Sequence, residues 1–323
     1  MNPTISIKPY VADDAPVWDR IVRQSCNGNF LHVRQYMDYH NDRFVDCSLI
    51  VSRHGKPVAV FPASRHDRVV RSHGGLTYGG LIHTDELGAQ DTLCAFEAIA
   101  AHYRDEGVDS VLYKAVPQPF HRRPSQGDLY ALTRCGAQLV RRDASSIVFL
   151  AEQASFSKGR KWAINKARKA QVAVRRSHDL AAFHALLGDV LKKFGATPTH
   201  SLHELQLLSA RFPDEIALHI AERDGTLLAG TLIYDFGHIV HTQYMANSDA
   251  GREEGALDLL IAELIRGTYA DRQFFSFGIS TEHEGTCLNE GLIAQKEAFG
   301  ARTIVHDFYQ WPLVSVPGQQ AAP

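Results

Sequence analysis

The sequence predicts an α/β protein of two similar domains, each with a mixed, mostly antiparallel sheet flanked by helices. Its 323 residues exceed what one hydrophobic core usually spans. Hydrophobic residues make up 45% and charged residues 22%, which is typical of a globular chain and excludes disordered or fibrous classes. A repeated order of elements predicts domains at 1–150 and 151–313, followed by a flexible tail at 314–323.

In the first half, apolar alternation on both sides of a turn at 53–56 predicts a hairpin over residues 47–61. A further short strand and a glycine-rich stretch at 74–80 precede a predicted helix at 91–104. A strand at 108–113 follows. The predicted unit is therefore three strands, a loop, a helix and a strand.

The second half repeats this order at a nearly constant offset. The corresponding elements are a hairpin at 216–234, a strand at 239–245, a loop at 247–255, a helix at 256–269 and a strand at 274–277. Gly225 lies 170 residues after Gly55, and Glu263 lies 166 residues after Glu97. Duplication of one domain explains these offsets, although hairpin-then-helix is also a common local order.

A basic segment lies between the halves. Residues 155–170 predict a helix that leads into a strand at 171–174, and no Asp or Glu occurs between Glu152 and Asp179. A second helix is predicted at 180–194, and Ser201 with Glu204 forms a capping box before the next helix. The basic helix is interpreted either as a site for a phosphorylated substrate or as the solvated face of an amphipathic helix. Association with a membrane surface through this helix is a third interpretation.

The net charge and the cysteines indicate which ligands and which cellular compartment to expect. A net charge of -2 gives no whole-molecule attraction to DNA, so any phosphate-binding surface is local. The five cysteines form no C-x-x-C pair, which predicts a reducing, cytoplasmic setting. No stretch approaches the length of a transmembrane helix. His238 and His241 point to opposite faces of a predicted strand, so we expect no metal.

The loop after the third strand of the second repeat is a candidate anion site. Ser248, Gly251, Arg252 and Gly255 lie between a strand and a helix, where backbone N–H groups bind phosphate oxygens. The spacing is not that of a P-loop, which needs Lys-Ser or Lys-Thr after the second glycine. An ordinary loop with helix-favouring acids explains the segment equally well.

The densest polar cluster surrounds the ends of the last predicted strands. His241 and Tyr244 precede the glycine loop, Asp258 lies in the next helix, and polar residues at 276–285 follow a strand. Strand ends of this kind line ligand crevices in open α/β sheets. Structural roles are the alternative: Asp258 satisfying buried amides, and Tyr244 serving as a core aromatic with a wet hydroxyl.

Three segments of the second half resemble the FemAB-like branch of the GNAT acyltransferases. They are Phe277–Thr281 (FGIST), Leu288–Leu292 (LNEGL) and Lys296–Arg302 (KEAFGAR). The first half adds Tyr78–Gly80, Lys114–Pro117 and His121–Pro124, so the resemblance covers nearly the whole chain. It implies tandem GNAT-like domains.

The resemblance implies transfer of an acyl or aminoacyl group to an amine, on an amino sugar or peptide in envelope polysaccharide or peptidoglycan assembly. The acceptor would be a small-molecule or lipid-linked amino sugar, and the donor acetyl-CoA or another acyl-CoA. The donor's pyrophosphate would lie on amides between Ser248 and Gly255, although the family's R/Q-x-x-G-x-G/A spacing is absent. FemAB enzymes proper use aminoacyl-tRNA, and several carry a long helical hairpin. No sustained heptad run occurs here, which favours CoA over tRNA.

Amine attack on a thioester needs a base, an oxyanion donor and an acid for the leaving group. We expect Glu282 or His241 as the base, and Tyr244 as the acid or as an orienting group, positioned by Asp258. The residues expected to bind the acceptor are polar or basic: Arg160, Lys161, Lys166, Arg168, Ser280, Asn289 and Lys296. The alternative is a binding module that kept the tandem fold and lost catalysis.

Overall fold

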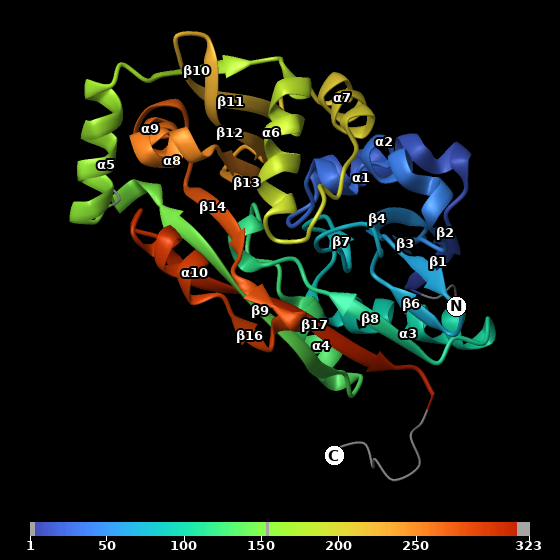
Figure 1. Cartoon of the computed structure of the whole chain (residues 1–323). Helices are drawn as coiled ribbons and strands as arrows, with labels where there is room; N and C mark the ends of the chain where they lie inside the picture. Colours follow the sequence, from blue (N-terminus) through green and yellow to red (C-terminus); the bar gives the residue numbers. More distant parts are fainter. Residues whose placement is uncertain (1–3, 153–154, 315–323) are drawn as a thin grey trace. The chain divides into compact units, whose positions relative to one another are not determined.

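The computed structural model describes residues 4–152 and 155–314, which divide into two compact units (Figure 1). The second unit comprises Ala144–His283 and Cys287–Ile304, and the first takes in the chain before and after these segments. Two long strands, β9 (Gln138–Phe149) and β17 (Arg302–Pro312), begin in one unit and end in the other. The tail predicted at 314–323 lies, from residue 315 onward, outside the described residues.

The first unit contains an antiparallel sheet of order β1-β3-β4-β7 and a second set of strands in the order β17-β8-β6-β5-β2. Its other helices and strands are β1 (Ile5–Pro9), α1 (Ala15–Gln24), α2 (Arg34–Met37), β2 (Val45–Asp46), β3 (Leu49–Arg53), β4 (Lys56–Phe61), β5 (Ser64–His66), β6 (Val69–Arg71), β7 (Ile82–His83), α3 (Ala89–Asp105), β8 (Ser110–Lys114) and α4 (Gly127–Arg134). Phe96 of α3 and Trp311 of β17 pack in its core with ring centroids 4.8 Å apart.

The second unit contains strands in the order β10-β11-β12-β13-β14-β9. Its elements are α5 (Lys158–Lys169), β10 (Ala173–Ser177), α6 (Leu180–Lys192), α7 (Leu202–Arg211), β11 (Ile216–Arg223), β12 (Thr226–Asp235), β13 (Ile239–Asn247), α8 (Asp249–Glu254), α9 (Ala256–Glu263), a π-helical turn (Leu264–Thr268), β14 (Phe274–Ile279), β15 (Thr281–Glu282), β16 (Cys287–Leu288) and α10 (Glu290–Glu297). Neighbouring strands are antiparallel except for β13 and β14, which are parallel.

Helices cover both faces of this second sheet. Ala229 and Ile233 of β12 belong to the core that α5 and α9 also line. Gly230 faces the other way, because successive side chains of a strand alternate between faces. A Cβ atom on Gly230 would lie 2.6 Å from the Phe183 ring of α6. The α9 face and the α6 face of the sheet are therefore distinct surfaces, and Figure 1 shows α6 next to β13.

The two hairpins share details that support duplication. The turn residues His54 and Gly55 have φ of 48° and 79°, and Asp224 and Gly225 have φ of 50° and 75°. Each hairpin also has a β-bulge just before its turn, between Val51 and Ser52 in β3 and between Ala221 and Glu222 in β11. Turn and bulge recur at the same offset of 170 residues, and the predicted tandem α/β fold is confirmed.

The structure corrects one expected element. The loop predicted at 247–255 is mostly helix α8, which Ser248 caps by accepting a hydrogen bond from the Gly251 N–H at 2.9 Å. Gly255 then takes φ of 76°, ends α8 and lets α9 begin in a new direction. In the part of the chain that the structure describes, every helix is too short or too polar to cross a membrane.

Candidate active site

Strands β13 and β14 separate part-way along their length. They pair over only three residues, and the last pair is His241 with Ser276. Beyond this point β13 continues to Asn247 alongside β12, while β14 continues to Ile279 alongside β9. A parallel pair that opens in this way leaves backbone groups of both strands without a sheet partner across the gap. The point where the two strands separate is therefore a candidate position for an extended ligand.

His241 lies at the point where the strands separate. Its Nδ1 is 3.0 Å from the Ser276 hydroxyl, which also accepts a hydrogen bond from the Gly278 N–H at 3.4 Å. Gly278 has φ of 73°, and a Cβ atom there would lie 3.1 Å from the His241 ring. Gly278 thus lets the end of β14 lie against the imidazole, and Ser276 orients the ring.

Tyr244 lies on the same face as His241. A bulge at Gln243 shifts the alternation, since Tyr244 pairs with Leu232 while Thr242 pairs with Ile233. The Tyr244 hydroxyl is 2.5 Å from Nδ1 of His200 and accepts the His200 backbone N–H at 3.3 Å. Burial raises the pKa of Tyr244 above its usual value, so the phenol stays protonated at neutral pH. Its partner is His200, whereas Asp258, expected to position it, contacts Arg160.

A pocket of about 520 Å³ opens beside the far end of β13. Helices α5, α6, α8, α9 and α10 contribute to it, and its lining is Arg160, Val190, Phe194, Met245, Asn247, Arg252, Leu257, Asp258, Leu292 and Gln295. Its size is that of a small-molecule site, about 300–1,000 Å³. Three residues predicted for the site, Arg160, Arg252 and Asp258, meet here.

The polar groups of this pocket differ in whether the chain itself supplies their partners. Arg160 forms an ion pair with Asp258 and stacks on Phe299, with its guanidinium carbon 4.8 Å from the ring centroid. Asn247 Oδ1 is buried and has no hydrogen-bond partner among the described residues. Apolar side chains from β13 and from the surrounding helices, Met245 and Val190 among them, complete the walls. The pocket therefore suits a ligand with an anionic or amide-rich part and an apolar part.

The glycines of α8 are explained by packing within the chain. A Cβ atom on Gly251 would lie 2.4 Å from both Asn247 Oδ1 and the Leu228 carbonyl oxygen. A Cβ atom on Gly255 would lie 2.5 Å from the Ala163 carbonyl oxygen of α5. Contacts this short do not occur, so both positions exclude a side chain whether or not a phosphate binds nearby.

Lys296 is buried and hydrogen-bonded to the end of β14 and to the residue that follows it. Its amine donates to the carbonyl oxygens of Gly278 at 2.9 Å and Ile279 at 2.6 Å, and to the Ser280 hydroxyl at 2.8 Å. Burial lowers the pKa of Lys296 to about 8. Leu292, one turn earlier on α10, lines the pocket. Lys296 therefore fixes α10, and with it one pocket wall, to the end of β14.

Glu282 and Asn289 form a separate, exposed pair. The Asn289 amide donates to Glu282 at 2.7 Å, and its oxygen caps α10 by accepting the Leu292 N–H at 2.9 Å. Lys161, Lys166 and Arg168 are exposed on α5. The predicted residues therefore fall into several places: the His241 strand gap, the Arg160–Asp258 pocket, the Lys296–Ser280 contact, the Glu282–Asn289 pair and the outer face of α5.

Residues 155–284 match the family model of the acetyltransferase (GNAT) domain, and this segment includes β13, β14 and the Arg160–Asp258 pair. The structure of FemX is similar over 95% of this chain and 97% of that one, with a TM-score of 0.67 at 12% identity. Residues 155–284 therefore form a GNAT domain, and the chain as a whole has a fold similar to that of FemX.

Two further solved structures share the fold. One is the C-terminal domain of a protein described as a lysylphosphatidylglycerol synthetase from Agrobacterium fabrum, with a TM-score of 0.62 at 12% identity over 93% of this chain and 92% of that one. The other is a tandem GNAT protein from the clavulanic acid biosynthesis pathway, with a TM-score of 0.51 at 12% identity over 97% and 99%. A search of curated protein sequences finds no match.

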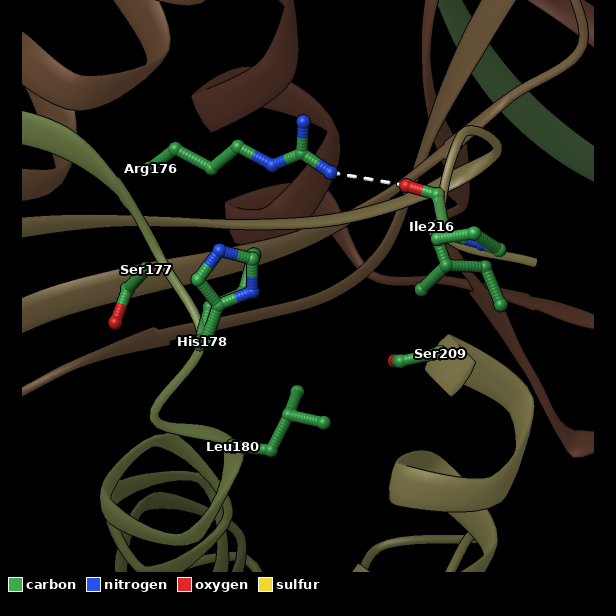
Figure 2. A pocket seen from close by; sticks show the side chains of 8 residues that line it. Arg176, Ser177, His178, Leu180, Ser209 and Ile216 are labelled. Atoms are coloured by element: carbon green, nitrogen blue, oxygen red, sulfur yellow. Dashed lines mark hydrogen bonds between the residues drawn. The ribbon is translucent and has the colours of Figure 1, made fainter. Parts of the chain in front are cut away.

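The GNAT domain contains a second, smaller pocket between β10, α7 and β11. Its volume is about 80 Å³, and Arg176, His178 and Ser209 are among its lining residues (Figure 2). Arg176 donates a hydrogen bond to the Pro213 carbonyl oxygen at 3.0 Å across this space. A cavity of this size holds a few waters and is too small for a donor or acceptor substrate.

Several residues of the candidate site could not be predicted from the sequence. His200 lies 44 residues before its partner Tyr244, and no local pattern connects the two. Asn247 and Gln295 reach the pocket from a strand end and a helix, and their residue types alone carry no signal. Within residues 4–152 and 155–314, no group of three or more His, Cys, Asp or Glu is arranged to hold a metal ion.

Proposed function

We propose that this GNAT acyltransferase moves an acyl group from a CoA thioester to a primary amine. The observation that carries this proposal is the arrangement of two sites along β13. His241 lies where β13 and β14 separate, and Met245 and Asn247 line the arginine pocket at the far end of the same strand. Four residues of strand span about 13 Å, which an extended pantetheine arm can bridge. Met245 and Asn247 face α9, whereas His241 and Tyr244 face α6, so the arm would pass between β13 and β14 where these strands separate.

The donor would bind with its anionic end near Arg252, because Arg160 in the same pocket is already paired with Asp258. Both arginines line the pocket, and guanidinium groups bind phosphate oxygens with several donors each. Asn247 Oδ1 supplies a buried acceptor for an amide N–H of the arm. The thioester would then lie in the strand gap, beside His241.

We assign the two proton transfers of the reaction to His241 and Tyr244, which both lie on the α6 face of the sheet. Nε2 of His241 takes a proton from the attacking amine, and Ser276 holds the ring through Nδ1. The new C–N bond forms as the C–S bond breaks, and the departing thiolate takes the proton of the Tyr244 hydroxyl. A raised pKa suits this role, because it keeps the phenol protonated. Glu282 is exposed and bound to Asn289, which makes His241 the better base.

The acceptor class we propose is an amine on an amino sugar or peptide used in envelope polysaccharide or peptidoglycan assembly. The likeness of fold to FemX and to the lysylphosphatidylglycerol synthetase domain supports an envelope substrate, small or lipid-linked. All five cysteines are free, which goes with the cytoplasmic location that we propose.

An aminoacyl donor carried on tRNA is the second candidate. Atoms of Asn247, Leu228 and Ala163 fill the space beside Gly251 and Gly255. These glycines therefore do not by themselves form a binding site for pyrophosphate. The lysylphosphatidylglycerol synthetase domain shares the fold, and its name implies transfer of a lysyl group.

Acyl transfer from acetyl-CoA and longer acyl-CoAs to a panel of amino sugars and peptides, followed by thiol release, tests the proposal. We expect His241→Gln to lower kcat by about 100-fold or more with little change in the KM of the donor. Glu282→Gln is the matched control, because it removes the competing base while retaining the hydrogen bond to Asn289. A large loss in Glu282→Gln with full activity in His241→Gln would reverse the assignment.

A thermal shift series decides the donor class. A ligand that binds only the native state raises the unfolding temperature by mass action. We expect CoA to raise it in the wild type and to lose most of this effect in Arg252→Gln. A shift with charged tRNA and none with any CoA species would replace the CoA donor with the aminoacyl donor.

A further inference from the structure

The outer face of α5 carries a group of cations around one tryptophan. Lys158, Lys161, Lys166, Arg168 and Lys169 are all exposed, and Trp162 is 66% exposed. We propose that this face docks the protein on an anionic lipid surface, an interaction distinct from the transfer chemistry. The proposal does not depend on which acyl donor the enzyme uses.

Helix geometry places these residues on one side. With about 100° per residue, Lys158, Trp162, Lys166 and Lys169 follow one another along the outward side of α5. Ile164 and Ala167 point inward and are buried in the core of the second unit. The helix is therefore anchored by its apolar side and presents its basic side to solvent.

The inward and outward basic residues differ in their partners. Arg160 faces Asp258 and is neutralised by it. Among the described residues, none of the five outward cations forms an ion pair, whereas exposed Arg175 and Lys193 pair with Glu222 and Asp249. The charge on this face is therefore available to an anionic partner, and a chain of net charge -2 gains this attraction only locally.

The tryptophan favours a lipid surface over a nucleic acid. Trp162 lies between Lys158 and Lys166, one helical turn from each, and the Lys166 amine is 5.3 Å from its ring centroid. An indole among lysines suits the interface of a bilayer, where the ring enters the headgroup region and the lysine stems extend to phosphates. Grooves that bind single-stranded nucleic acid stack several bases on several aromatic side chains, whereas this face has one aromatic side chain only.

The chain contains its own reporter for this docking. Of its three tryptophans, Trp18 is 0% and Trp311 is 1% exposed, so Trp162 alone reports on the solvent. Vesicles of phosphatidylglycerol and phosphatidylcholine, and vesicles of phosphatidylcholine alone, are titrated into the full-length protein at low salt. We expect sedimentation with the anionic vesicles only, a blue shift of the emission, and release at high salt.

Variants of α5 test which residues carry the docking. Each cation removed lowers vesicle affinity by about fivefold, so Lys161→Gln/Lys166→Gln/Lys169→Gln together lower it by more than about 50-fold. Trp162→Ala binds more weakly and loses the emission shift. The charge-matched control is Arg20→Gln/Arg23→Gln/Lys192→Gln, which changes exposed cations of α1 and α6 and retains binding.

Several outcomes overturn the proposal. They are no sedimentation with anionic vesicles at low salt, equal sedimentation with neutral vesicles, or equal losses in the two triple variants. Retention of tRNA that depends on α5, with vesicle binding that does not, would assign the face to RNA. Since none of these readouts measures acyl transfer, failure here is distinguishable from failure of the proposed catalysis.

Discussion

Arg160 and Asp258 form an ion pair that joins the beginning of α5 to the beginning of α9, across 98 residues of sequence. Asp258 is 8% exposed, and the Arg160 guanidinium also stacks on Phe299 of the same unit. The pair closes one wall of the pocket that we assign to the donor. A change in this pair is therefore expected to alter both the stability of the unit and the donor binding that we propose.

A double-mutant cycle separates these roles. Asp258→Asn leaves a largely buried guanidinium without its charge partner, and we expect a loss of about 2 kcal/mol in the free energy of unfolding. Arg160→Met alone costs a similar amount. The double variant Arg160→Met/Asp258→Leu loses clearly less than the sum of the two single variants. Additive losses in urea unfolding would mean that the two side chains do not interact in solution.

Backbone carbonyl oxygens of the protein leave no space for a side chain at Gly251 and Gly255. Gly255→Ala places a Cβ atom 2.5 Å from the Ala163 carbonyl oxygen at a φ of 76°, and Gly251→Ala meets the Leu228 carbonyl oxygen at 2.4 Å. We expect each to lower the unfolding free energy by roughly 3 kcal/mol.

Gly188 supplies the control for this pair. It lies inside α6, and a Cβ atom placed there would have no other atom within 4 Å. Gly188→Ala should raise stability by about 0.5–1 kcal/mol, because alanine restricts the unfolded chain and fits a helix without strain. Stable Gly251→Ala and Gly255→Ala proteins that had lost only CoA binding would assign the glycines to the ligand instead.

The raised pKa of Tyr244 leads to a prediction about the alkaline limb of the pH–rate profile. Burial raises the pKa of its hydroxyl, so the acid form persists beyond the usual titration range of a tyrosine. A fall in kcat below pH 10 is therefore caused by another group and remains in Tyr244→Phe, which we expect to lower kcat by about 10–100-fold at every pH. An alkaline limb below pH 10 that disappears in Tyr244→Phe would contradict the raised pKa.

Lys296 makes stability rise with alkaline pH. Its folded pKa is lowered to about 8 from the usual 10.5, so between these values the unfolded chain binds one more proton than the folded chain. The unfolding free energy then increases with pH across that window, by up to about 3 kcal/mol. Lys296→Met removes this slope, and the difference between wild type and variant in urea unfolding at pH 7.5 and pH 10 measures it. If the difference in unfolding free energy between wild type and Lys296→Met were the same at both pH values, the Lys296 amine would have an ordinary pKa in the folded protein.

Much of the architecture was predictable because it depends on local periodicity and turn chemistry. The hairpins turn at Gly55 and Gly225, since only positive φ values close both turns tightly. The basic helix α5 and the capping box at Ser201 and Glu204 lie where the sequence indicates them. The glycine segment after β13 was expected to be a loop, because glycines weaken helix propensity, yet packing against Leu228 and Ala163 requires them there.

The partners of the site residues, by contrast, could not be read from local patterns. Residue type and strand or helix position were enough to indicate a tandem α/β fold and to select His241, Tyr244, Asp258 and Arg160 as candidates, since these are local properties. The pairing of Asp258 with Arg160 and of Tyr244 with His200 arises in the folded chain. Long-range contacts of this kind depend on sheet register and helix packing, where a shift of one residue reverses the face on which a side chain lies.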